Sequence, residues 1–220
     1  TLAIHAGQAP EGLTGAVVVP IFQTSTFAQD AVGKHRGYEY ARTGNPTRTA
    51  LETCLAALEG GAWGLAFASG MAATDAIAHL LASGDHVVMA DDVYGGTYRL
   101  FARVFDRAGL TLTAVDMREP RNVRRALRKS TTLVWIESPT NPMLKVVDIA
   151  AVAALAREAG ALSVVDNTFA SPYLQQPLLI GADLVLHSTT KYLGGHSDVV
   201  GGAIAGTAPK LRERLAFIQN

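Results

Sequence analysis

The sequence predicts an α/β protein built on one mostly parallel sheet of seven strands with helices on both faces. From residue 63 onward, short apolar runs alternate with amphipathic helical segments, which is the pattern of a sheet covered on both sides. Of the 220 residues, 49% are apolar and 17% are charged, so the chain can bury a sizeable core. No internal repeat or low-complexity linker divides the chain, and one large domain is therefore expected.

The chain begins with a segment that does not share this periodicity. Residues 1–36 contain short apolar pieces interrupted by proline and glycine, which predicts an N-terminal arm that packs on the body or on a neighbouring subunit. The domain itself is expected to span 37–220. Its first helix should begin at Asn45 and Pro46, with Asn45 as N-cap and proline in the first turn, and should end at Gly60.

The remaining elements follow the alternation. Strands are predicted near 63–68, 86–90, 111–115, 132–137, 162–166, 183–187 and 199–205. Helical segments are predicted between the first five strands, near 71–82, 96–108, 119–128 and 148–159. The link between the last two strands is too short and glycine-rich for a covering helix, so the last strand is predicted to be antiparallel.

The composition limits the kinds of partner that the protein can be expected to bind. Lys+Arg and Asp+Glu are each 19, so no bulk field favours nucleic acid or an anionic membrane, and a small molecule or another protein is the expected partner. No signal peptide and no apolar run long enough for a bilayer is present, which predicts a cytoplasmic protein without membrane contact. The six histidines form no H-E-x-x-H motif and Cys54 is the only cysteine, so no metal site is expected.

A lysine and two hydroxyl residues follow the strand at 183–187. Ser188 and Thr190 occupy alternate positions, so in an extended segment they face one way, as suits a phosphate, while Lys191 faces the other. A nucleophilic lysine must be neutral, which needs partial burial or a cationic neighbour to lower its pKa. The position of Lys191 after a buried strand suits that need. A solvated loop lysine explains the spacing equally well.

Other chemistry-bearing residues stand at strand ends, where ligands gather in open α/β sheets. Gly70 and Met71 open a helix whose free N–H groups suit a phosphate. The Tyr94 ring can stack on a flat cofactor, and Asn141 is a side-chain donor in a proline-fixed turn. Asp166 ends a buried strand and needs a cationic partner such as a protonated pyridine nitrogen, although capping the following turn is an alternative role.

The stretch 183–198, D-L-V-L-H-S-T-T-K-Y-L-G-G-H-S-D, resembles the lysine signature of the cystathionine/methionine-metabolism family of pyridoxal-phosphate enzymes. The resemblance covers essentially 1–220 and implies an aspartate-aminotransferase-like (fold type I) large domain. It implies that Lys191 bonds to pyridoxal 5'-phosphate and then carries protons with Tyr94. It also implies that Asp166, in the D-N-T-F context, pairs with the ring nitrogen, and that the phosphate site includes Ser188 and Thr190.

The resemblance also implies a site shared between chains. Tyr40 and Arg42, in Y-E-Y-A-R, match the family's tyrosine and arginine that reach a neighbouring subunit's cofactor phosphate. An arginine fork suits that contact because it pairs two phosphate oxygens at once. A plain surface arginine is the alternative. Dimers or a homotetramer are therefore expected, with substrate contacts from Asn141, Arg99 and Arg42.

Within the family, the segments at 94–99 and 195–202 most resemble cystathionine γ-synthases and γ-lyases. This implies transsulfuration at the γ-carbon of cystathionine or an O-acylhomoserine, in methionine or cysteine biosynthesis. Gly96 stands where methionine γ-lyases typically carry cysteine, and Arg99 where sulfhydrylases tend to carry asparagine; these enzymes and cystathionine β-lyases are alternatives. Family members continue into a small C-terminal domain, which we expect to be absent here, so a non-catalytic subunit that binds only cofactor or a partner chain is the rival hypothesis.

Overall fold

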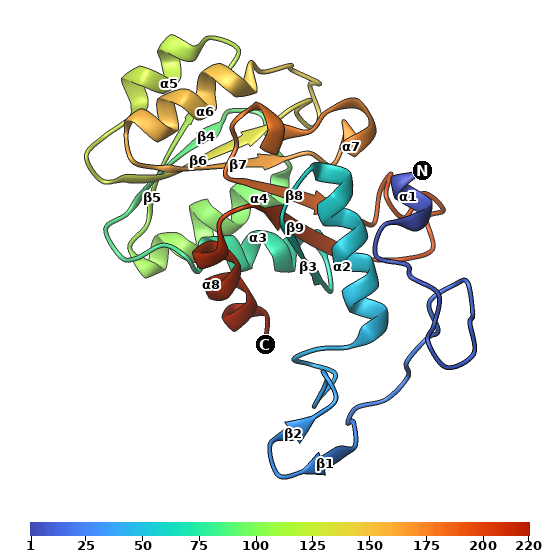
Figure 1. Cartoon of the computed structure of the whole chain (residues 1–220). Coiled ribbons are helices and arrows are strands. Elements are labelled where there is room, and N and C mark those ends of the chain that lie inside the picture. The colour runs from blue at the N-terminus through green and yellow to red at the C-terminus, as the bar shows by residue number, and fades with distance from the viewer.

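A computed structural model describes residues 1–220 and contains a seven-stranded mixed sheet in the order β3-β9-β8-β7-β6-β4-β5 (Figure 1). The strands are β3 (Trp63–Phe67), β4 (His86–Ala90), β5 (Thr111–Val115), β6 (Thr131–Glu137), β7 (Leu162–Asp166), β8 (Leu184–Ser188) and β9 (Gly202–Gly206). Strands β4 to β8 pair in parallel, whereas β9 is antiparallel to both β8 and β3. The predicted mostly parallel sheet with an antiparallel last strand is confirmed.

Helices cover both faces of the sheet, as predicted. Helices α5 (Pro120–Ala126) and α6 (Ile149–Glu158) lie above the sheet in Figure 1, and α3 (Gly70–Ala78), α4 (Gly95–Arg99) and α8 (Pro209–Gln219) lie below it. Helix α2 (Pro46–Glu59) packs on β3 and β9. Short helical turns complete the set: α1 (Leu2–His5), α7 (Ser171–Leu174) and the 3-10 turn Pro177–Ile180.

Local sequence signals predicted the ends of one helix correctly but not the form of another. Asn45 caps α2, because its Oδ1 accepts the N–H of Thr47 at 2.9 Å, and Gly60 ends the helix with φ 68°. The single helix expected over 96–108 instead has three parts, since α4 continues as a π-helix, Leu100–Val104, and a 3-10 turn, Phe105–Ala108. No helix combines the length and apolarity that crossing a bilayer would need.

The core lies between the central strands and the two helical layers. Met89, Trp135 and Leu186 are among its fully buried side chains and come from β4, β6 and β8. Burial of one such side chain contributes about 1.5–3 kcal/mol. The strands that end at the site are therefore held by the best-packed part of the molecule.

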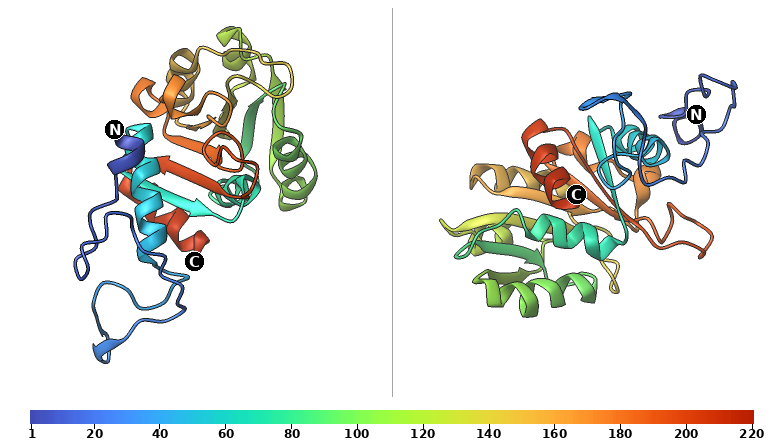
Figure 2. Two further views of the ribbon diagram at one scale, coloured as in Figure 1. Left: turned by 90° about the vertical axis from the view of Figure 1, so that its right-hand side faces the viewer. Right: turned by 90° about the horizontal axis from the view of Figure 1, so that it is seen from below.

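The N-terminal segment stands apart from this core. Its two-stranded hairpin, β1 (Gln29–Ala31) and β2 (Lys34–His35), projects away from the body (Figures 1 and 2). Leu13 and Ile21 are 91% and 85% exposed. Because this segment buries little of its apolar surface on its own body, its expected packing against a neighbouring subunit stays a prediction.

Candidate functional site

A cleft of about 450 Å³ opens at the carboxyl ends of the central strands. It is the only one of the main cavities that gathers residues from the ends of β6, β7 and β8 together with the start of α3. Most of the residues predicted from the sequence line it, namely Gly70, Met71, Tyr94, Asn141, Asp166, Ser188, Thr190 and Lys191. The structure thus brings together residues that are up to 121 positions apart in the chain, Gly70 and Lys191.

One wall of the cleft is rich in hydrogen-bond donors. The first turn of α3 presents N–H groups without intrahelical partners, and the Ser69 hydroxyl accepts only the N–H of Ala72, at 3.0 Å. Gly70 sits so close to β8 that a Cβ there would lie 2.9 Å from Cβ of Ser188. This approach places the helix N-terminus beside the hydroxyl of Ser188, a set of donors that suits a phosphate, while the Thr190 hydroxyl lines the same cleft and bonds to the backbone of Gly201.

A second wall of the cleft, at the end of the neighbouring strand β7, carries a buried carboxylate. Asp166 ends β7, and its Oδ1 accepts both the N–H and the hydroxyl of Thr168, at 3.0 and 2.5 Å. The Thr168 hydroxyl also accepts the N–H of Ser188 at 2.9 Å, which ties the two walls together. Burial raises the pKa of Asp166, while the bonds from Thr168 and the charge of His187 act to lower it. A buried carboxylate in this position favours a cationic ligand group.

Glu137, at the end of β6, is a cleft residue that the sequence reasoning missed. Its two carboxyl oxygens accept the N–H groups of Tyr94, at 2.9 Å, and Asn141, at 2.8 Å. Burial and the neighbouring charge of Asp166 raise the pKa of Glu137 to about 8. Its position at a strand end, directly before S-P-T-N-P, was the available signal, and the register confirms that it pairs with Asp166 across β6 and β7.

The direction expected for Lys191 in an extended segment does not hold in this chain. Strand β8 stops at Ser188 and the chain turns, so Lys191 lines the same cleft as Ser188 and Thr190 instead of facing away. Lys191 is exposed in the single chain, and it also lines a neighbouring cavity together with Thr190 and Tyr192. Alternation along a strand predicts direction only as far as the strand continues.

Three predicted site residues do not reach this cleft. Arg99 is exposed at the end of α4 and is not among the lining residues. The Arg42 guanidinium lies 5.2 Å from the centre of the Tyr40 ring, and its Nε donates to Oδ1 of Asn220 at 3.2 Å. Both Tyr40 and Arg42 lie outside the cleft of their own chain.

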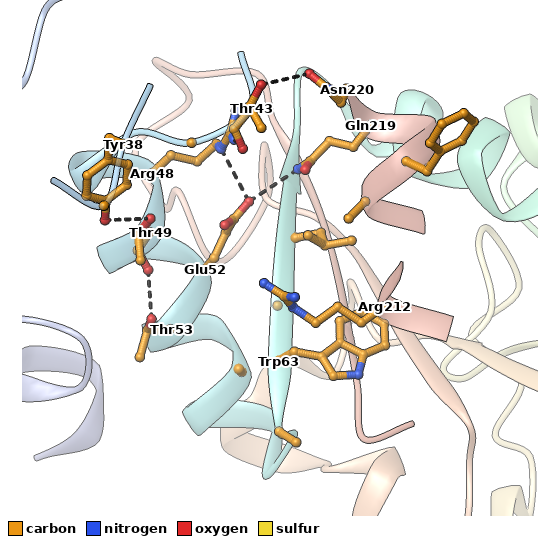
Figure 3. Close-up of a pocket in the computed structure, with 18 of the residues that line it drawn as sticks. Tyr38, Thr43, Arg48, Thr49, Glu52, Thr53, Trp63, Arg212, Gln219 and Asn220 are labelled. Atoms are coloured by element: carbon orange, nitrogen blue, oxygen red, sulfur yellow. Dashed lines mark hydrogen bonds and ion pairs between the residues drawn. The ribbon is translucent and has the colours of Figure 1, made fainter. Parts of the chain in front are cut away.

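A separate polar cavity of about 780 Å³ lies between α2, β3 and α8 (Figure 3). Glu52 accepts from Gln219 at 3.2 Å and lies 3.5 Å from Nε of Arg48, and Thr43 donates to Asn220 at 3.3 Å. Its main polar groups therefore bind one another. None of the predicted site residues lines this cavity.

An α/β sheet with strand-end donors for an anion, a buried carboxylate for a cation and a lysine in the same cleft is typical of cofactor-dependent enzymes. The whole chain, residues 1–220, matches the family described as Cys/Met metabolism PLP-dependent enzyme, and the chain belongs to that family.

Individual relatives agree with this family. The chain is 60% identical to a probable cystathionine gamma-synthase of Herpetosiphon aurantiacus, covering 100% of the chain and 69% of the relative. It is 55% identical to a cystathionine gamma-lyase of Bacillus subtilis, covering 100% and 58%. The crystal structure of cystathionine gamma-lyase from Lactobacillus plantarum complexed with L-serine matches with a TM-score of 0.96 and 49% identity, covering 99% of this chain and 57% of that one. The chain thus spans a little over half to two thirds of these proteins.

Proposed function

We propose that the protein uses pyridoxal 5'-phosphate for transsulfuration at the γ-carbon of cystathionine or an O-acylhomoserine, as a γ-synthase or γ-lyase. The observation that carries the proposal is the single cleft that holds Lys191, Asp166 and the donor set around Ser188. Relatives named for both reactions match the whole chain, so the choice between them stays open. We also propose that the protein is located in the cytoplasm.

The cofactor fits the two walls of the cleft. Its phosphate would be held by the first N–H groups of α3 at Gly70 and Met71 and by the hydroxyls of Ser188 and Thr190. Its ring nitrogen would be paired with Asp166, whose buried carboxylate is hydrogen-bonded within the chain by Thr168 alone. When bound, pyridoxal phosphate supplies an electron sink for charge that develops at the substrate.

The chain's own residues supply binding and proton transfer. Lys191 would attach the cofactor and then, as a free amine, accept the proton from Cα of the amino-acid substrate. Tyr94 stands across the cleft as a ring to cover the cofactor and as a second proton carrier for Cβ. Asn141 would contact the substrate, and Glu137 holds both Tyr94 and Asn141 by their backbone N–H groups.

We further propose that dimers or tetramers complete the site. Tyr40 and Arg42 lie between β2 and α2 in the chain and outside their own cleft, which supports a role toward a neighbour's cofactor phosphate. Arg99 and Arg42 would contribute substrate contacts in that assembly. Because each site would need two chains, cofactor affinity and association should be linked.

The first test is chemical labelling of the purified chain. Pyridoxal phosphate should give a yellow protein, and borohydride reduction followed by peptide mapping should place the pyridoxyl group on Lys191. Lys145 is the matched control, since its Nζ already pairs with Asp91 at 2.8 Å. A label on Lys145 or Lys129 that persists in Lys191→Ala would overturn the assignment. Release of an oxoacid from cystathionine, or thiol transfer to an O-acylhomoserine, then separates lyase from synthase and from a chain that only binds cofactor.

A further inference from the structure

Directly behind the cleft lies a buried polar group that the proposed reaction does not use. Glu59 is 1% exposed and His187 is 3% exposed, and Oε1 of Glu59 lies 2.5 Å from Nε2 of His187. The same Oε1 accepts a hydrogen bond from Nδ2 of Asn167 at 2.8 Å. The second oxygen of Glu59 and Nδ1 of His187 are buried without any partner. Such groups are costly to bury, so their presence calls for a specific role.

The position of Glu59 makes its burial more costly still. It is the last residue of α2, where the helix dipole is negative, and no basic residue of the helix's own last turn offsets it. His187 is the one ionisable side chain paired with it. The His187 ring is therefore the side chain placed to offset the burial of the carboxylate at the helix end.

Strand geometry connects this pair to the cleft. Leu186 and Ser188 line the cleft, and His187 between them points through the sheet to the α2 side. Asn167, which follows Asp166, donates to Glu59 and to the carbonyl of Gln175, and Gln175 donates back to Asn167 and to the carbonyl of Ser138 at 2.9 Å. One network thus joins the ends of α2, β7 and β8 to the turn that carries Asn141.

We propose that Glu59 and His187 are positioning residues that hold the ends of β7 and β8, and with them the carboxylate of Asp166, in the arrangement that binds the cofactor ring. This inference rests on the proposed function, because the placement of Asp166 matters for activity only when a cationic cofactor ring binds. The charge of His187 is among the influences that lower the pKa of Asp166. Glu59 acts one step further away, through its contacts with His187 and with Asn167, the residue that follows Asp166.

A double-mutant cycle tests whether Glu59 acts through Asp166. Glu59→Gln keeps the shape and one acceptor but removes the charge, and it should weaken pyridoxal phosphate binding, measured by absorbance titration, by about tenfold, a typical coupling within one network. In an Asp166→Asn background the same change should have no further effect. His187→Gln should behave in the same way. Equal losses in both backgrounds would mean that the pair serves only to stabilise the fold.

A matched control and a second readout complete the test. His86 is fully buried too, but it binds Thr131 and Thr113 at the other end of the strands, so His86→Gln should lower the melting temperature without changing cofactor affinity. In cofactor-free protein, Glu59→Gln should speed amide hydrogen exchange in 166–175 and 186–190, and His86→Gln should not. Unchanged exchange there overturns the inference alone, whereas a wild type that binds no pyridoxal phosphate overturns the proposed function.

Discussion

Glu137 should make the cofactor-free protein less stable as the pH rises. Burial and Asp166 raise the pKa of Glu137 from 4.5 to about 8, so the folded state holds a proton that the unfolded state releases. The contribution of Glu137 to the free energy of unfolding is fully present below pH 4.5 and is lost as the pH rises toward 8. The full difference corresponds to roughly 5 kcal/mol, an upper limit because Asp166 shares the proton.

Urea unfolding of cofactor-free protein at pH 5, 6, 7 and 8 measures this slope. Glu137→Gln should flatten it, because glutamine does not titrate, at the cost of one of the two backbone bonds from Tyr94 and Asn141. Glu119→Gln is the control, since its carboxylate is mostly exposed. Saturating pyridoxal phosphate should reduce the slope without abolishing it, because a cation at Asp166 offsets its repulsion of Glu137 but leaves Glu137 buried. A Glu137→Gln protein with the wild-type slope would refute the reasoning.

Three further predictions concern the cleft and its sharing between chains. Asp166→Asn should retain weakened cofactor binding but lose turnover by orders of magnitude, because the ring nitrogen loses its charged partner; near-normal turnover would make Asp166 a turn cap only. Gly70→Ala should weaken cofactor binding on the order of tenfold, since its Cβ would lie 2.9 Å from Cβ of Ser188 and one donor set would shift; unchanged affinity in a titration would show that the wall tolerates the methyl group. Mixing inactive Arg42→Ala and Lys191→Ala proteins should restore partial activity if sites are crossed, and no recovery in proven mixed dimers would place Arg42 within its own chain.

Much of the fold was predictable because its signals are local. Apolar runs, helix caps and Gly60 act over a few residues, so the strands and α2 were placed closely. Asp166 was predictable as well, since a carboxylate at a buried strand end is unusual wherever its partners lie. The short hairpin at 29–35 and the π-helix after α4 had no comparable local signal.

The rest of the site depends on contacts between distant segments. Glu59 and His187 are 128 residues apart, and Asn167 is 108 residues from Glu59, so no spacing rule links them. Glu137 was missed because its partners, Tyr94 and Asn141, are backbone groups of two loops, and a sequence shows side chains but not which N–H groups they meet. The direction predicted for Lys191 failed because β8 ends at Ser188, where a turn replaces the extended chain. The sequence did not show where that strand would end.

Strand β3 has only one neighbour in the sheet, and that neighbour is made last. It pairs with β9 alone, with Phe67 opposite Gly202, while β9 bridges β3 to β8. More than a hundred further residues must therefore be synthesised after β3 before β9 can pair with it and bring the start of α3 next to Ser188. Contacts between segments so far apart in the sequence form slowly. We expect the anion site to be the last part of the protein to form, so pyridoxal phosphate added during refolding should bind only as β9 docks. Cofactor absorbance that rises before the protection of β3 amides would contradict this order.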